Sequence, residues 1–284
     1  MNARDQVLIT AAELSALIEA GEAVTILDVR WKLDAPDGLA AYRDGHIPGA
    51  VYVSLDDELS DHSVTGRGRH PLPSGSTLQE AARRWGIRQE GLVVAYDDFN
   101  RMGSGRAWWV LTAAGVTNVR ILDGGLAAWR ASGGSLETGA VEPQPGNVTV
   151  LHEDLYAGGL PTLTAEQAGA GSVPLFDARA PERYRGDHEP ADAQAGHIPG
   201  AKNLPFAKLL TGDGTFLDDD ALTRELSDRG IERDVPVGAY CGSGVSATVI
   251  VAALTAAGHE VALYPGSWSE WSSDPTRSVA RGDE

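Results

Sequence analysis

The single cysteine of the chain, Cys241, lies in the stretch AYCGSGVSATVIV at residues 239–251. The run VPVGAY before it is typical of a strand, and VSATVIVAALTAAG after it is typical of a packed helix. In such a turn the backbone N–H groups point at whatever occupies its mouth. Gly242 and Gly244 are expected to adopt positive φ, which curls these N–H groups into a nest that favours a thiolate. We therefore predict that Cys241 is a nucleophile and not a structural thiol.

The residues around Cys241 disfavour two reactions that reactive cysteines perform. A cysteine phosphatase needs an arginine six residues after the cysteine to bind the phosphate oxygens, and Ala247 stands there. A thiol–disulfide oxidoreductase needs a second cysteine, and the chain has one. What remains is a thiolate that accepts a group alone, held by backbone N–H groups and by the hydroxyls of Ser243 and Ser246.

Four sequence motifs occur twice and in the same order, which indicates a duplicated domain. The pairs are ILDVR (26–30) with LFDAR (175–179), GHIPGA (45–50) with GHIPGA (196–201), WGIRQEGLVVAYDD (85–98) with RGIERDVPVGAYCG (229–242), and LDGGLAAW (122–129) with YPGSWSEW (264–271). We expect an N-terminal domain at 1–135, a Gly- and Pro-rich linker at 136–160 and a C-terminal domain at 161–284.

Within each half, helix-like segments alternate with short apolar runs. This order predicts an α/β fold in which each domain is a parallel sheet flanked by helices on both faces. Capping boxes are expected at Thr10 to Glu13 and at Thr164 to Gln167, where each half begins its first predicted helix. Residues that occur in both halves are expected to maintain the fold; these are His46, His197, and the Asp-x-Arg pairs Asp28/Arg30 and Asp177/Arg179.

The composition excludes several classes of partner. A formal net charge of −17 opposes binding to nucleic acid or to an anionic membrane, so an anionic substrate needs a locally positive site. No apolar run reaches the roughly 18 to 20 residues that a membrane-spanning helix needs. The N-terminal residues lack the apolar region of a signal peptide, and one cysteine excludes an intramolecular disulfide. We therefore expect a cytoplasmic globular protein.

These residues resemble the tandem-domain sulfurtransferases, the family of rhodanese and 3-mercaptopyruvate sulfurtransferase. GHIPGA in both halves, DGG followed by a tryptophan, and GSWSEW carry the resemblance over nearly the whole chain. The resemblance implies two rhodanese-like domains, with the sulfur-accepting Cys241 in the second and Asp97 at the equivalent place in an inactive first domain. It also implies that the thiolate takes a sulfane sulfur from a small anionic sulfur donor and passes it to cyanide or a thiol acceptor. No metal and no organic cofactor are implied.

The loop after the cysteine resembles that of the mercaptopyruvate enzymes, because rhodanese proper carries Arg and Lys there. It consists of Gly242, Ser243, Gly244, Val245 and Ser246. The resemblance further implies that Arg183 in PERYRG holds the substrate carboxylate. It implies that Ser243 relays protons with a histidine and an aspartate, which map to His70 in RHPLP and Asp56 in VSLDDE.

One feature departs from the mercaptopyruvate enzymes, in which a second carboxylate-binding arginine precedes the second GHIPG. The segment here reads GDHEPADAQAGHIPG and has no arginine. A lost charge-assisted contact weakens binding by about ten- to a hundredfold. Arg101, Arg106 and Arg185 are the arginines considered as replacements.

Three readings of the function stay open at this point. The first is a sulfurtransferase that uses mercaptopyruvate or thiosulfate through a Cys241 persulfide. The second is a thiosulfate-specific rhodanese, or a persulfide carrier that delivers sulfur to a partner protein. The third is a non-catalytic rhodanese-like binding module, against which the retained cysteine, loop glycines and hydroxyls speak.

Overall fold

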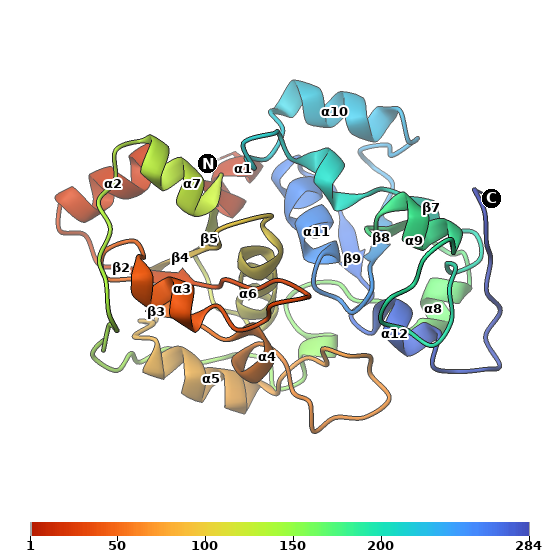
Figure 1. Cartoon of the computed structure of the whole chain (residues 1–284), viewed down its shortest axis with the longest axis horizontal. Helices are drawn as coiled ribbons and strands as arrows, with labels where there is room; N and C mark the ends of the chain where they lie inside the picture. Colours follow the sequence, from red (N-terminus) through yellow and green to blue (C-terminus); the bar gives the residue numbers. More distant parts are fainter. Residues whose placement is uncertain (1, 284) are drawn as a thin grey trace. The chain divides into compact units, whose positions relative to one another are not determined.

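The computed structural model describes residues 2–283, which form two compact units (Figure 1). The first unit comprises the residues up to Asp61 together with Leu72–Leu160 and Leu210–Phe216. The second comprises His62–Pro71, Pro161–Leu209 and the residues from Leu217 on. A short segment of each sequence half thus packs with the other unit, and the segment 136–160 packs with the first. The residue limits that the sequence suggested for the two domains and the linker stay predictions.

The first unit is built on a parallel five-stranded sheet in the order β1-β5-β4-β2-β3. Its strands are β1 (Leu8–Ile9), β2 (Val24–Asp28), β3 (Val51–Tyr52), β4 (Leu92–Tyr96) and β5 (Val119–Leu122). Its helices are α1 (Ala3–Val7), α2 (Ala11–Glu19), α3 (Leu39–Asp44), α4 (Leu55–Glu58), α5 (Gly75–Arg84), α6 (Met102–Ala113), α7 (Gly125–Ala131) and the 3-10 turn η1 (Leu155–Ala157). Parallel strands joined by helices are the predicted α/β arrangement.

Alternation of side chains along β2 and β4 supplies both faces of this sheet with apolar residues. Ile26 and Val94 point to the face where Leu14 of α2 and Trp129 of α7 complete a buried core. On the other face α6 packs against β4 and β5. The sheet is therefore covered on both sides, as predicted.

The second unit repeats this plan with four parallel strands in the order β7-β6-β8-β9. Its strands are β6 (Leu175–Asp177), β7 (Lys202–Asn203), β8 (Val237–Tyr240) and β9 (Val261–Leu263). Its helices are α8 (Ala165–Gly169), α9 (Pro181–Arg185), α10 (Asp219–Ser227), α11 (Ala247–Ala256), α12 (Ser267–Trp271) and the 3-10 turn η2 (Phe206–Leu209). The predicted capping boxes are present at the first residues of α2 and α8.

The residues found in both halves have the structural roles expected of them. Asp177 and Arg179 form a buried ion pair with Nη2 and Oδ2 at 2.6 Å, and Asp28 and Arg30 form its counterpart at 2.9 Å. His197 stacks on Tyr184 with ring centroids 3.8 Å apart. Its Nδ1 lies 2.8 Å from the Tyr184 carbonyl oxygen, which can only accept, so Nδ1 carries the proton. His46 repeats this arrangement with Tyr42.

Candidate active site

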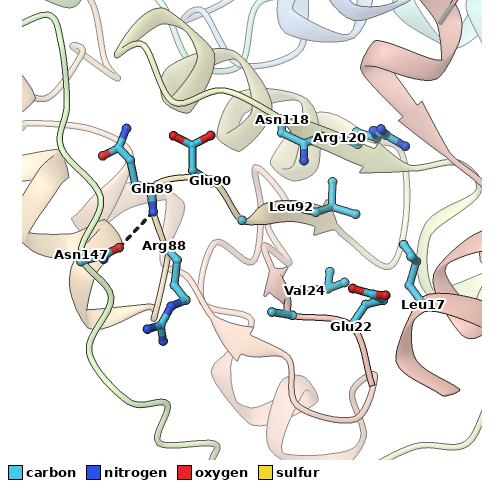
Figure 2. Close-up of a pocket in the computed structure, with 12 residues that line it drawn as sticks. Leu17, Glu22, Val24, Arg88, Gln89, Glu90, Leu92, Asn118, Arg120 and Asn147 are labelled. Atoms are coloured by element: carbon cyan, nitrogen blue, oxygen red, sulfur yellow. Dashed lines mark hydrogen bonds between the residues drawn. The ribbon is translucent and has the colours of Figure 1, made fainter. Parts of the chain in front are cut away.

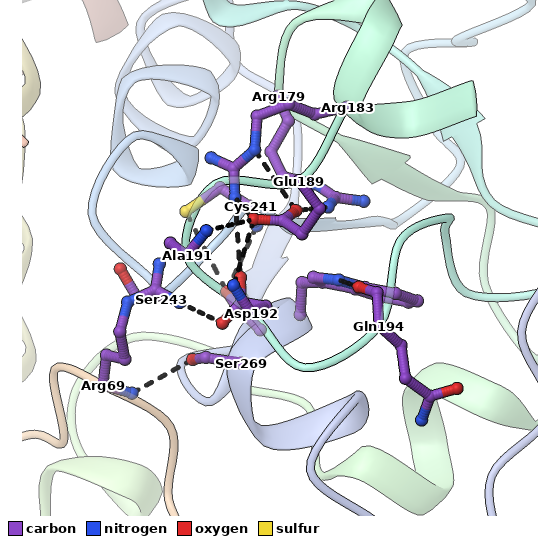
Figure 3. A network of polar contacts seen from close by, with 12 residues as sticks. Arg69, Arg179, Arg183, Glu189, Ala191, Asp192, Gln194, Cys241, Ser243 and Ser269 are labelled. Atoms are coloured by element: carbon purple, nitrogen blue, oxygen red, sulfur yellow. Dashed lines mark hydrogen bonds and ion pairs between the residues drawn. The ribbon is translucent and has the colours of Figure 1, made fainter. Parts of the chain in front are cut away.

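Cys241 lies directly after β8, at the carboxyl end of the second sheet, and α11 begins six residues later (Figure 3). Its Sγ accepts a hydrogen bond from the Gly244 N–H at 3.2 Å. The Ser267 hydroxyl lies 4.0 Å from Sγ and also accepts from the Cys241 N–H at 3.1 Å. The side chain is buried, with 1% of the residue's surface exposed. The predicted strand-to-helix loop is thus present, with an N–H group aimed at the sulfur.

Two details of this loop differ from the expectation. Gly244 has φ +76°, as predicted, but Gly242 does not have positive φ. Gly242 instead leaves room for two guanidinium groups, because a Cβ there would lie 3.2 Å from Arg69 Nη2 and 3.4 Å from Arg183 Nη1. The second difference concerns the hydroxyls: within residues 2–283, neither Ser243 nor Ser246 bonds Sγ, and the hydroxyl 4.0 Å from Sγ is that of Ser267, which donates to the Tyr264 carbonyl oxygen at 2.9 Å.

The Ser243 hydroxyl is bonded to His70 Nδ1 at 2.8 Å, and both residues are buried in the second unit. His70 reaches this site because the segment His62–Pro71 packs with the second unit. A hydroxyl that contacts an imidazole can exchange a proton with it. Asp56 lies on α4 of the first unit, where its Oδ1 accepts from the Trp31 indole N–H at 3.0 Å. Its place in a relay stays a prediction.

Arg183 lies in α9 and directs its guanidinium toward the cysteine loop (Figure 3). Its Nη2 is 2.7 Å from Glu189 Oε1 and 3.5 Å from Asp192 Oδ2. The second acid also binds Arg69, whose Nη1 contacts Asp192 Oδ1. Two guanidinium groups are therefore held beside Gly242 by buried carboxylates.

Arg69 was missed by the sequence reasoning, although it directly precedes His70 in RHPLP. The signal that could have found it is this adjacency, since a residue next to a predicted site histidine is carried to the same site. The three arginines considered as replacements are bound elsewhere: Arg101 pairs with Asp97, Arg106 donates to the Leu59 carbonyl oxygen, and Arg185 pairs with Asp187.

The two carboxylates that hold the arginines differ in their protonation behaviour. Burial alone would raise the pKa of Glu189, but hydrogen bonds from Arg183 and from the Ala191 N–H hold that pKa below its usual value. Burial raises the pKa of Asp192 although Arg69 opposes the shift. The site thus keeps Glu189 ionised as the counterion of Arg183, while the charge of Asp192 is less favoured.

In the first unit Asp97 follows β4 as Cys241 follows β8, and its carboxylate is saturated by its own loop. Oδ2 accepts from the Ser104 N–H at 3.0 Å and from the Ser104 hydroxyl at 2.7 Å. Oδ1 accepts from the N–H groups of Phe99 and Arg101 and pairs with Arg101 Nη2 at 2.9 Å. The Asp97 carboxylate therefore accepts hydrogen bonds from the N–H groups of its loop, whereas in the Cys241 loop the Gly244 N–H donates to the sulfur.

The first unit also contains a cavity of about 640 Å³ at the amino ends of β2, β4 and β5 (Figure 2). Polar residues that line it include Glu22, Arg88, Gln89, Asn118 and Asn147. Ligand sites of open parallel sheets lie at the carboxyl ends of strands, where Cys241 is found.

Among residues 2–283, no group of three or more His, Cys, Asp or Glu side chains could hold a metal ion. No helix in the same range is long and apolar enough to cross a membrane.

Comparison with known proteins decides the family. A family model described as the rhodanese-like domain matches residues 10–132 and again residues 160–274. The chain belongs to the rhodanese family. Its two matches confirm the predicted pair of rhodanese-like domains, and the curated relatives confirm an enzyme of the sulfurtransferase class.

Several rhodanese-family relatives cover almost the whole chain. A Mycobacterium tuberculosis protein named "Putative thiosulfate sulfurtransferase SseB" is 69% identical over 99% of this chain and 99% of its own length. The "Probable 3-mercaptopyruvate sulfurtransferase" of Pseudomonas aeruginosa is 42% identical over 97% of this chain and 98% of its own. The crystal structure of SseA from Escherichia coli, described as a 3-mercaptopyruvate sulfotransferase with the rhodanese fold, aligns with a TM-score of 0.80 at 32% identity. That alignment covers 92% of this chain and 98% of that one.

Proposed function

We propose that this sulfurtransferase moves a sulfane sulfur from 3-mercaptopyruvate, through a persulfide on Cys241, to cyanide or a thiol. The observation that carries the proposal is the Sγ atom bonded by the Gly244 N–H, in a loop flanked by the guanidinium groups of Arg69 and Arg183. A nucleophile with an N–H group aimed at it and cations beside it suits an anionic sulfur donor.

The proposed reaction has two half-reactions that balance. In the first, the Cys241 thiolate forms an S–S bond with the thiol sulfur of mercaptopyruvate, and the C–S bond breaks. The electron pair of that bond goes to C3, which becomes the enolate of pyruvate and takes up the proton that the new persulfide releases. In the second, cyanide attacks the terminal sulfur, so thiocyanate leaves and the Cys241 thiolate is restored.

Ser243 and His70 are proposed to carry the proton to C3. Their contact of 2.8 Å supports this role, because proton transfer needs hydrogen-bond distance between the groups. Arg183 is proposed to bind the carboxylate of the sulfur donor, since its Nη1 faces the space above Gly242. Asp56 is kept as a proposed third member of the relay, and the cytoplasmic location expected from the sequence stays a prediction.

Thiosulfate is the second candidate sulfur donor. The name of the M. tuberculosis relative favours it, and so does Arg69, because a second cation beside the loop suits a dianion. In that case the Cys241 thiolate takes the outer sulfur and sulfite leaves with the electron pair of the broken S–S bond. Against it stands the loop CGSGVS itself, which contains no cationic side chain.

Steady-state rates with each sulfur donor, at a saturating cyanide concentration, decide between the two. The proposal predicts a higher kcat/KM for mercaptopyruvate than for thiosulfate. Replacing Gly242-Ser243 by Arg-Lys should move the preference toward thiosulfate. A higher kcat/KM for thiosulfate in the unmodified protein would refute mercaptopyruvate as the preferred substrate and would leave the persulfide chemistry standing. If neither sulfur donor gives a rate above background, sulfur transfer is refuted and the non-catalytic binding module remains.

A further inference from the structure

Two guanidinium groups converge on the space above Gly242 in the second unit. Arg69 Nη2 lies 3.2 Å from the position of a Cβ on Gly242, and Arg183 Nη1 and Nη2 lie 3.4 and 3.5 Å from it. Gly242 directly follows Cys241, so this space lies beside the loop that contains the reacting sulfur. The absence of a side chain at Gly242 keeps it open.

Both guanidinium groups are fixed from behind by one carboxylate. Asp192 Oδ1 contacts Arg69 Nη1, and Asp192 Oδ2 lies 3.5 Å from Arg183 Nη2. The Asp192 side chain is 4% exposed, whereas those of Arg69 and Arg183 are 29% and 16% exposed. The acid is thus buried, whereas the side chains of both cations are partly exposed.

Each cation keeps a donor nitrogen for a ligand. Within residues 2–283, neither Arg183 Nη1 nor Arg69 Nη2 is hydrogen-bonded to a protein acceptor, and both face Gly242. A carboxylate has two oxygens that can accept from two such groups at once. The spacing therefore suits one planar carboxylate held between the two arginines.

We infer that Arg69 is a specificity-determining residue that binds the carboxylate of the sulfur donor together with Arg183, with Asp192 as the positioning residue that holds both side chains. This inference rests on the proposed function and adds the residues that recognise the carboxylate of its sulfur donor. Arg69 then supplies the second cationic contact that the segment before the second GHIPG lacks.

The test compares two thiols that differ only in the carboxylate. Mercaptopyruvate carries it, and 1-mercaptopropan-2-one has a methyl group in its place. Arg69→Ala should lower kcat/KM for mercaptopyruvate about ten- to a hundredfold, mainly through a higher KM, because one charge-assisted contact is lost. The same variant should leave kcat/KM for 1-mercaptopropan-2-one within about twofold of the unmodified protein, since no carboxylate contact exists to lose.

Two further variants complete this experiment. Arg69→Lys should recover part of the loss, because it keeps the charge without the planar fork. Arg130→Ala is the control, since it removes an exposed arginine of α7 in the first unit and should change neither rate. The 3.0 Å hydrogen bond from the Arg69 N–H to Ser269 Oγ involves the main chain at Arg69, so we expect it to be retained when that side chain is replaced.

The outcomes separate this inference from the proposed function. An unmodified protein that turns over mercaptopyruvate, with Arg69→Ala equally efficient, would overturn the role of Arg69 and leave sulfur transfer intact. An equal loss with both thiols would also overturn it, because a carboxylate contact cannot affect the neutral thiol. An unmodified protein that transfers no sulfur from mercaptopyruvate would contradict the proposed function and this inference with it.

Discussion

At the scale of single residues, the charges beside Cys241 are arranged in a chain of ion pairs. Arg179 binds Asp177 and Glu189, Glu189 binds Arg183, and Asp192 joins Arg183 to Arg69. Each carboxylate in this chain is at least 96% buried, so each depends on its arginine to remain compatible with the interior. The guanidinium of Arg183 is therefore held in one orientation before any substrate arrives.

The role of Arg183 can be tested by its removal. Arg183→Ala should lower kcat/KM for mercaptopyruvate about ten- to a hundredfold, because a charge-assisted contact to the carboxylate disappears. Steady-state kinetics with cyanide as acceptor measure the effect. Arg185→Ala is the control, since Arg185 pairs with the exposed Asp187 and should have no influence. An unchanged efficiency in Arg183→Ala would contradict the assignment.

Ser243 and Ser246 allow a matched comparison of two loop hydroxyls. Ser243→Ala should reduce kcat about ten- to a hundredfold with little change in KM, because its hydroxyl contacts His70 Nδ1 and carries the proton in the proposed relay. Ser246→Ala should be close to unmodified, since that hydroxyl bonds neither the sulfur nor the start of α11. Equal rates for the two variants would remove Ser243 from the relay.

The site residues fall into two groups. The positions of some are set by neighbouring residues in the sequence, and others reach the site only through tertiary packing. Cys241 and Gly244 were predictable because a strand, a loop and a helix fix their relative positions within a few residues. Arg69 was not, because the sequence separates it from Asp192 by more than a hundred residues and only tertiary packing brings them into contact. Ser267 was missed for the same reason, since its approach to Cys241 depends on the turn between β9 and α12.

At the scale of elements, the loop from β8 to α11 depends on one glycine. Gly244 has φ +76°, and a Cβ there would collide with the Pro265 carbonyl oxygen. Its N–H bonds the sulfur, so both the fold of the loop and the environment of Cys241 rely on this conformation. A side chain at this position is expected to disturb stability and activity together.

Gly244→Ala should lower the free energy of unfolding by about 2–5 kcal/mol, from left-handed strain and from the collision. It should also reduce sulfur transfer by at least about tenfold, because the N–H moves away from the sulfur. Gly230→Ala is the control: Gly230 has φ +69° with nothing within 4 Å, so only the strain of about 1–2 kcal/mol applies. Urea unfolding and steady-state rates test both variants, and equal losses in the two would contradict this account.

The equivalent loop of the first unit should contribute stability and no chemistry. Asp97→Asn breaks a buried ion pair with Arg101 and should lower the free energy of unfolding by about 3–5 kcal/mol. Its kcat at a temperature where the protein stays folded should remain close to that of the unmodified protein. Circular dichroism tests whether the Asp97→Asn variant is folded, and steady-state kinetics measure its kcat. A loss of activity as large as that of Cys241→Ser, in folded protein, would make Asp97 a catalytic residue.

At the scale of the whole molecule, the duplicated motifs predicted the two parallel sheets because each half contains the same order of strands and helices. They did not predict that His62–Pro71 packs with the second unit or Leu210–Phe216 with the first. Exchanges of this kind leave no mark in hydrophobic periodicity, since the exchanged segments contain no strand and little apolar sequence. The exchange matters for function because it delivers both Arg69 and His70 to the unit that contains Cys241.

The mass of the protein after exposure to a sulfur donor tests the central claim most directly. Incubation with mercaptopyruvate, without an acceptor, should add about 32 Da, the mass of one sulfur, to the intact protein. Peptide mapping should place that sulfur on Cys241, cyanide should remove it, and Cys241→Ser should show neither the added mass nor turnover. A Cys241 persulfide as the intermediate would be contradicted by any of three results: no increase in mass, a sulfur on another residue, or a Cys241→Ser variant that still transfers sulfur.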